Sequence, residues 1–122
     1  MILVDTSVWI EYLRKDDRAG GLAELLELDL VLLHPWVLGE LVLGGLGSQR
    51  SAIMDLRHLP AAPVVSDGEV LDLILERRLT GRGIGWVDTN LLASALVAAG
   101  DLWTLDTRLA RTARDLGVSC PY

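Results

Sequence analysis

The chain has few cysteines and no long apolar stretch, so it lacks the features that form disulfides or anchor a protein in a membrane. Cys120 is the only cysteine among 122 residues, so no disulfide can form within the chain, and we expect a cytoplasmic protein that folds in the reduced state. The longer stretches without charge, such as Leu41–Gln49 and Leu91–Gly100, fall well short of the about 20 apolar residues that a membrane-spanning helix needs. The apolar start Met1–Val4 meets Asp5 at once, which excludes a signal peptide.

Basic side chains are also scarce. The chain has 11 Lys and Arg residues against 17 Asp and Glu residues, a net charge of −6, and Lys15 is the only lysine. This balance argues against a protein that simply coats nucleic acid. It does allow an enzyme that gathers carboxylates in one metal pocket and keeps arginine at the rim. Apolar residues make up 51% of the chain, which excludes disorder, and the length predicts a single domain over residues 1–122.

Short apolar runs alternate with segments of helical spacing. The runs predict strands, and proline, serine and glycine mark helix ends between them. The order predicts an α/β fold in which helices sandwich a mostly parallel sheet. The expected strands are Ile2–Val4, Leu30–Leu33, Pro63–Val65, Leu102–Leu105 and Val118–Cys120. The expected helices cover about 8–13, Arg18–Leu28, Pro35 to Gly44, Ser48–His58, Ser66 to about Leu79, Asp88–Ala99 and Thr107–Leu116.

Four acids fall where such a sheet builds its sites. Asp5 and Asp106 each end a predicted strand, Asp88 starts a helix, and Glu40 lies inside a very apolar helix. If the two strands are neighbours, these acids converge at one edge of the sheet. Carboxylate oxygens are the ligands that Mg²⁺ and Mn²⁺ prefer. The alternative is that the three aspartates only cap helices. Glu40 favours the metal site, because a mostly buried glutamate is costly unless it is paired or binds a metal.

Four segments, in order along the chain, carry a family resemblance. They are Ile2–Trp9 with its acid Asp5, Glu40 within the third helix, Trp86–Ala95 with Asp88, and Leu102–Asp106 with Thr104 two residues before the last acid. The chain resembles PIN-domain ribonucleases, and among them the VapC-type toxins of bacterial toxin–antitoxin pairs.

The resemblance implies a three-layer α/β/α sandwich with strand order 3-2-1-4-5. It also implies an endoribonuclease that depends on Mg²⁺ or Mn²⁺, acts on RNA, forms a homodimer and is inhibited by a cognate VapB-type antitoxin. The catalytic and metal-binding residues are then Asp5, Glu40, Asp88 and Asp106.

Each of the other side chains near the acids has a structural interpretation and at least one functional interpretation. The hydroxyls of Thr6, Ser7 and Thr104 orient a carboxylate or a metal-bound water, or they only cap helices. Arg108, the first of three arginines spaced three apart on the last helix, binds an RNA phosphate or lies on a solvated face. Trp9 packs in the core, stacks on bases or lines an antitoxin groove, and the same holds for Trp36.

Two further features are predicted to be structural. His34 ends a strand near the acids but belongs to no zinc pattern or catalytic triad. The repeat Gly81-x-Gly83-x-Gly85 does not join a strand to a helix as a dinucleotide-binding loop does, so we expect a turn.

Two functions of another class remain as alternatives. A PIN fold that only binds RNA or a protein would normally lack one of the four acids. A phospho-receiver domain needs an acidic pair after its first strand and a lysine after a later strand. Here Asp5 stands alone and no lysine follows Lys15, which disfavours that class.

Overall fold

A short parallel sheet forms the centre of the protein, in a computed structural model that describes residues 1–15 and 17–122. Strand β1 (Ile2–Val4) lies between β2 (Val31–Leu32) and β3 (Asp101–Trp103), and both pairings are parallel. Ile2 is in register with Val31 on one side and with Asp101 on the other. The carboxyl ends of β1 and β3 therefore lie side by side, as the placement of the first and last acids requires.

The outer positions of the sheet are single bridges instead of the two predicted edge strands. Leu33 pairs with Ala61 beyond β2, and Leu102 pairs with Ser119 beyond β3. This arrangement keeps the predicted order 3-2-1-4-5, but the strands expected at Pro63–Val65 and Val118–Cys120 do not form. Prolines explain both losses, because proline has no N–H to donate to a ladder. They are Pro60 and Pro63 around one bridge and Pro121 after the other.

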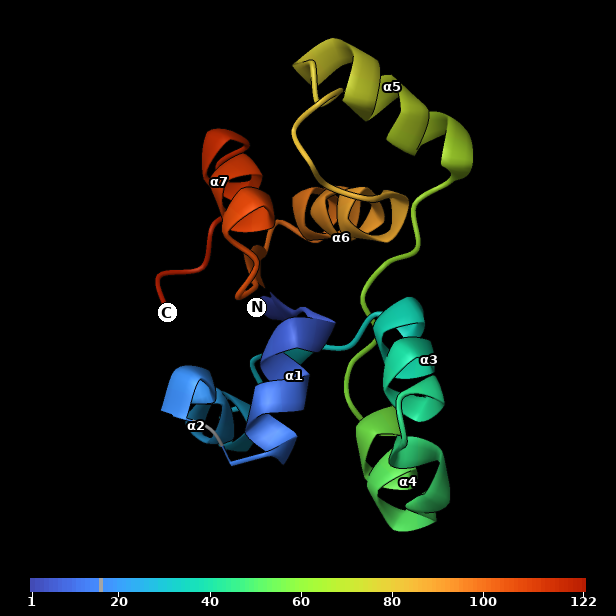
Figure 1. Cartoon of the computed structure of the whole chain (residues 1–122), viewed down its shortest axis with the longest axis vertical. Helices are drawn as coiled ribbons and strands as arrows, with labels where there is room; N and C mark the ends of the chain where they lie inside the picture. The colour runs from blue at the N-terminus through green and yellow to red at the C-terminus, as the bar shows by residue number, and fades with distance from the viewer. Residues whose placement is uncertain (16) are drawn as a thin grey trace.

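Helices cover both sides of the strands, which confirms the predicted α/β sandwich. Figure 1 shows α1 to α4 gathered in one half of the molecule and α5 to α7 in the other. Contacts from α6 reach β1 and β3, and α7 contacts β3. The helices are α1 (Thr6–Leu13), α2 (Leu22–Glu27), α3 (Pro35–Leu43), α4 (Arg50–Arg57), α5 (Asp67–Arg77), α6 (Trp86–Val97) and α7 (Thr107–Asp115), with 3₁₀ turns at Asp17–Ala19 and Leu46–Ser48.

Two predicted helices are broken. The helix expected over Arg18–Leu28 divides at Gly21, whose φ of +97° lies in the left-handed region that favours glycine. The helix expected over Ser48–His58 divides at Gln49, which has φ −112° and ψ 75°. By contrast, Ser66 caps α5 as predicted, because its hydroxyl accepts a hydrogen bond from the Glu69 N–H.

The core extends from the strands into α6. Residues Thr89 to Ala95 are all buried, as are the strand residues Leu3 and Val4. Helix α6 begins at Trp86, two residues before its predicted start, so Asp88 lies in its first turn. Within the described part of the chain, no helix is long and apolar enough to span a membrane.

Candidate active site

Asp5 lies at the carboxyl end of β1, where the parallel sheet presents its loops. Its side chain is only 8% exposed. One carboxylate oxygen, Oδ2, accepts hydrogen bonds from the Ser7 hydroxyl at 2.7 Å and the Thr104 hydroxyl at 2.8 Å. Two donors on one oxygen compensate the cost of burying the charge. Asp5 is therefore held firmly, by one hydroxyl from its own helix and one from the segment after β3.

The two hydroxyls also organise the chain that leads to Asp106. The Leu105 N–H donates to the Ser7 hydroxyl at 3.0 Å, and the Asp106 N–H donates to the Thr104 hydroxyl at 3.1 Å. Ser7 and Thr104 thus connect the ends of β1 and β3 through a polar network. Ser7 does not cap α1, which was one of its two predicted roles.

The three aspartates differ in whether they cap a helix. Asp5 precedes α1 but makes no cap hydrogen bond, so the capping alternative is wrong for this residue. Asp106 does cap α7, since its Oδ1 accepts from the backbone N–H groups of Arg108 and Leu109. Asp88 Oδ2 accepts from the Gly85 N–H at 2.9 Å. A helix-capping hydrogen bond therefore occupies one carboxylate oxygen of Asp88 and one of Asp106, and none of Asp5.

The environment of Asp88 shows that the three aspartates lie within electrostatic reach of one another. Burial raises the pKa of Asp88, and the negative charges of Asp5 and Asp106 raise it further, while the hydrogen bond from Gly85 opposes the rise. A carboxylate that is costly to ionise beside two others is typical of a functional site.

Glu40 lies on α3, within the helix that the sequence predicted, but its burial was predicted wrongly. It is exposed, although we expected it to be mostly buried. The reason is that α3 buries only Val37 and Leu41, so its other residues face outward or toward α1. The Thr6 hydroxyl donates to Glu40 Oε1 at 3.1 Å, which ties this acid to the first turn of α1, next to Asp5.

The free oxygens of the four acids decide whether a divalent metal fits here. Each acid has one oxygen held by protein donors, and the other accepts no hydrogen bond within residues 1–15 and 17–122. Within these ranges, no group of three or more Asp, Glu, His or Cys side chains is arranged so that it could hold a metal ion as it stands. An open set of carboxylate oxygens suits Mg²⁺, which usually keeps several waters and binds through few carboxylates. The chemistry of these donors therefore suits a hydrated divalent ion, and the side chains would have to move closer together to hold one.

The remaining predicted residues divide into core and surface. Trp9 is buried and packs edge-on against Tyr12, so base stacking is wrong for Trp9. His34 is buried, and its Nδ1 accepts from the Trp36 N–H at 3.1 Å at the start of α3, which supports a structural role. Arg108 is exposed on the first turn of α7, two residues after Asp106.

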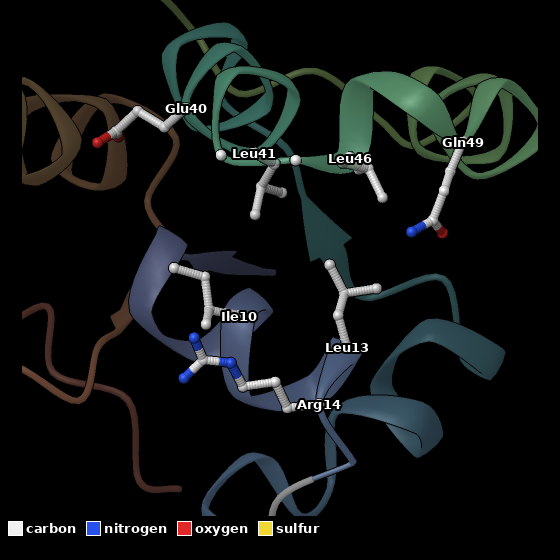
Figure 2. Close-up of a pocket in the computed structure, with 9 residues that line it drawn as sticks. Ile10, Leu13, Arg14, Glu40, Leu41, Leu46 and Gln49 are labelled. Atoms are coloured by element: carbon white, nitrogen blue, oxygen red, sulfur yellow. The ribbon is translucent and has the colours of Figure 1, made fainter.

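A groove lies between α1 and α3, and of the four acids only Glu40 lines it, together with Arg14. It has a volume of about 400 Å³ and apolar walls formed by Ile10, Leu13, Leu41 and Leu46. Figure 2 shows Glu40 at one end of this groove and Gln49 at the other. The sequence analysis did not locate this groove, because its walls come from helices about 30 residues apart in the chain.

Two contributors near the acids were also missed. The backbone N–H of Gly85 holds Asp88, and Gly83 lies against the side chain of Arg108. The available signal was the glycine repeat directly before Asp88, which was interpreted as a turn alone. The glycines do form a turn, and two of them also contact site residues.

Comparisons with known proteins agree with this arrangement. The sequence profile of the PIN domain matches residues 2–115. The chain is 51% identical over 121 residues to proteins named Ribonuclease VapC32 from two strains of Mycobacterium tuberculosis, CDC 1551 and H37Rv. The match covers 98% of this chain and 95% of each relative. The chain therefore belongs to the PIN-domain family and, within it, to the VapC group.

Proposed function

We propose that this chain, as a single domain of residues 1–122, is a metal-dependent endoribonuclease that acts in the cytoplasm as the toxin of a toxin–antitoxin pair. The observation that carries the proposal is that Asp5 and Asp106 follow neighbouring parallel strands and lie within electrostatic reach of Asp88, and that each of the three has a free carboxylate oxygen. The relatives' name, Ribonuclease VapC32, supports the same activity.

The four acids are proposed to hold Mg²⁺ or Mn²⁺. Asp5, Glu40, Asp88 and Asp106 would each offer the oxygen that no protein donor occupies. Such a bound ion supplies an activated water and neutralises charge on the phosphate under attack. Ser7 and Thr104 fix the orientation of Asp5, and Thr6 fixes that of Glu40. Hydrogen-bonded carboxylates keep their geometry while substrate enters.

Arg108 is proposed to bind a phosphate of the RNA. It lies two residues after Asp106, it is exposed, and no carboxylate in the described ranges forms an ion pair with it. A guanidinium presents a planar set of donors that matches phosphate geometry. An uncommitted arginine beside the acids would offset the repulsion between an acidic protein and its polyanionic substrate.

The antitoxin is proposed to bind the groove between α1 and α3. Its apolar walls suit the apolar residues of an amphipathic segment, and Glu40 at one end suits an arginine or lysine on that segment. A basic side chain there would form charge-assisted hydrogen bonds with the free carboxylate oxygens. Binding would then exclude metal and RNA together. A copurified antitoxin that leaves RNA cleavage unchanged would contradict this part of the proposal.

A homodimer is proposed from the exposed apolar residues outside the groove. Leu43 at the end of α3 is 90% exposed, and Leu71 and Leu75 lie four residues apart on α5 at 51% and 75% exposure. Residues four apart share one face of a helix. A monomer at micromolar concentration, measured by light scattering after size-exclusion chromatography, would count against the dimer.

The test of catalysis replaces each acid by its neutral amide. Asp5→Asn, Glu40→Gln, Asp88→Asn and Asp106→Asn keep the shape of the side chain and remove the charge that holds a metal. We expect each to lower cleavage of a structured RNA in Mg²⁺ by about 100-fold or more, with EDTA abolishing the wild-type activity. The matched control is Asp72→Asn, an exposed acid on α5. Full cleavage in EDTA would refute the metal role, and RNA binding without cleavage would favour the non-catalytic alternative.

A further inference from the structure

The loop between α5 and α6 contains two glycines with nearly the same backbone and different surroundings. Gly81 has φ +79° and Gly83 has φ +75°, both in the left-handed region. A Cβ placed on Gly81 would meet nothing within 4 Å. A Cβ placed on Gly83 would lie 2.7 Å from Cδ and 2.9 Å from Nη1 of Arg108. Backbone conformation alone therefore accounts for Gly81, but Gly83 is also needed because the Arg108 side chain lies directly on it.

This contact is part of a longer contact between the loop and α7. Arg82, the residue between the two glycines, pairs with Asp115 at the other end of α7. Arg108 and Asp115 are seven residues apart, two helical turns along the same face. The loop therefore contacts α7 at two points through long side chains: Arg108 of the first turn lies on Gly83, and Arg82 reaches Asp115 in the last turn.

The position of Arg108 is electrostatically unfavourable for a purely structural residue. It is the second residue of α7, where the helix dipole disfavours positive charge. No carboxylate in the described ranges forms an ion pair with it, whereas Arg82 does have such a partner. Packing on Gly83 directs the side chain along the loop, so the guanidinium keeps its donors free for a ligand.

The same loop leads directly to the acids. Two residues after Gly83, the Gly85 N–H donates to Asp88 at 2.9 Å, and the Gly85 carbonyl accepts from the Thr89 hydroxyl at 2.8 Å. The segment that carries the Arg108 side chain is therefore the segment that holds Asp88. A guanidinium packed on Gly83 is therefore only two residues along the chain from the backbone group that holds Asp88.

We propose that Gly83 is a positioning residue whose missing side chain seats Arg108 on the loop Gly81–Gly85, so that the guanidinium binds a phosphate of the RNA next to Asp88. The inference rests on the proposed function and adds a residue to it. Gly83 itself touches no substrate. A methyl group at position 83 displaces Arg108 and leaves the four acids unchanged.

The experiment compares Gly83→Ala with Gly81→Ala, each in the wild-type and in the Arg108→Ala background. Both substitutions place alanine at a positive φ, so loop strain is matched, and only one of them meets Arg108. We expect Gly83→Ala to raise KM for RNA in Mg²⁺ by about tenfold, the effect of losing a hydrogen bond to a charged group, while kcat stays within about twofold. We expect Gly81→Ala to change neither constant.

A binding measurement makes the test independent of cleavage. Fluorescence anisotropy of a labelled RNA without divalent metal gives Kd at several salt concentrations. The slope of log Kd against log salt should decrease by about one unit in Gly83→Ala and in Arg108→Ala, since each loses one phosphate contact. In the Arg108→Ala background, Gly83→Ala should add nothing, because the double-mutant cycle then lacks the group being positioned.

The outcomes separate this inference from the proposed function. Equal KM and equal salt slopes for Gly83→Ala and Gly81→Ala, with wild-type cleavage intact, would overturn the inference alone. So would a further loss from Gly83→Ala when Arg108 is already absent. The expected binding pattern without any cleavage would overturn the proposed activity alone, and no RNA binding by the wild type would overturn both. If Gly83→Ala does not fold, Arg108→Lys replaces it, because a lysine keeps the charge but lacks the flat guanidinium that packs on the glycine. It should then reproduce the rise in KM, and wild-type KM in Arg108→Lys would overturn the inference.

Discussion

Helices α3 and α6 each carry one of the four acids. The more apolar of the two, α3, is the less buried, and the more polar, α6, is the more buried. Glu40 is the only charged or polar side chain of α3 (Pro35–Leu43), yet this helix buries only Val37 and Leu41. Helix α6 (Trp86–Val97) contains several polar residues, and all seven residues from Thr89 to Ala95 are buried. Composition therefore does not decide which helix lies in the core.

Neighbouring elements explain the difference. Helix α6 contacts α5, β1 and β3, so it is covered on several sides. Its buried polar side chains all have acceptors within the chain: Thr89 donates to the Gly85 carbonyl, Asn90 to Trp86 and Ser94 to Pro63. Helix α3 contacts α1 and the turn that follows it, and four of its nine residues, Pro35, Gly39, Glu40 and Leu43, remain exposed. A buried helix tolerates polar groups when their hydrogen bonds are satisfied, and an apolar helix can remain exposed where no element covers it.

The contrast has a functional consequence. An exposed apolar helix beside an acidic site is a surface that a partner can cover, and exposed apolar patches commonly mark such surfaces. A buried helix with a satisfied polar interior is a rigid support for a catalytic acid. Helix α6 thus fixes Asp88, whereas α3 presents Glu40 at the end of the groove.

The largest effect should come from truncating one leucine in each helix. Leu92 on α6 is fully buried, and Leu43 on α3 is 90% exposed. Leu92→Ala should lower the free energy of unfolding by about 3 kcal/mol, because it leaves a cavity in the core. Leu43→Ala should change it by less than about 0.5 kcal/mol. Urea denaturation monitored by circular dichroism measures both, and similar losses would mean that α3 is covered in solution, for instance by a second copy.

A smaller effect should distinguish the acids of the two helices in the absence of metal. The pKa of Asp88 is raised by burial and by two neighbouring aspartates, so the folded state becomes less stable as pH rises from the unfolded pKa to the folded one. Asp88→Asn removes that cost and still accepts the Gly85 N–H. We expect its melting temperature at pH 7.5 in EDTA to equal or exceed that of the wild type. Glu40→Gln, on the exposed acid, should leave the melting temperature unchanged.

Adding Mg²⁺ sharpens the same comparison. An ion at 100 times its Kd should stabilise the folded wild type by about 2.7 kcal/mol through mass action, raising the melting temperature by several degrees. The shift should be lost in Asp88→Asn. If Mg²⁺ shifts nothing, and Asp88→Asn melts well below the EDTA-treated wild type, then Asp88 is only a helix cap.

The stability that His34 contributes at the start of α3 should decrease as the pH falls, whereas the stability cost at Asp88 increases as the pH rises. Burial lowers the pKa of His34, whose neutral Nδ1 accepts the Trp36 N–H. Stability from this residue is fully present above pH 6.5 and decreases as pH falls from 6.5 toward the lower folded pKa, because the unfolded chain binds the proton first. We expect a loss of about 1 kcal/mol, the usual value of a cap. His34→Asn retains an acceptor and does not titrate, so urea denaturation between pH 7.5 and 5 should show a weaker slope. An unchanged slope would remove His34 as its cause.

The smallest effect concerns the exposed face of α3. Gly39 lies in the interior of the helix, and a Cβ there would meet nothing within 4 Å. Gly39→Ala should therefore stabilise the protein by about 0.5–1 kcal/mol through helix propensity. Gly68 on α5 is the matched control, also helical and also open, and should respond alike. A loss at Gly39 with a gain at Gly68 would indicate that the α3 face is covered in solution.

Much of the site could be predicted from the sequence because its signals are local. Asp5 and Asp106 follow apolar runs, and parallel strands place their carboxyl ends together. The prediction for Glu40 was partly wrong because the apolar residues around it were taken as evidence of burial. The strands predicted at Pro63–Val65 and Val118–Cys120 do not form. The prediction did not consider that the nearby prolines cannot donate a backbone hydrogen bond to a neighbouring strand.

The sequence by itself determined the order of elements, the helix ends marked by Ser66 and Pro35, and which acids end strands. Each of these depends on residues within a few positions of one another. Three features depend on the folded structure: α6 is more deeply buried than α3, Thr104 reaches Asp5 across 99 positions, and Gly83 lies under Arg108. Burial and contact between distant segments depend on what packs against each surface, and no local pattern in the chain encodes that.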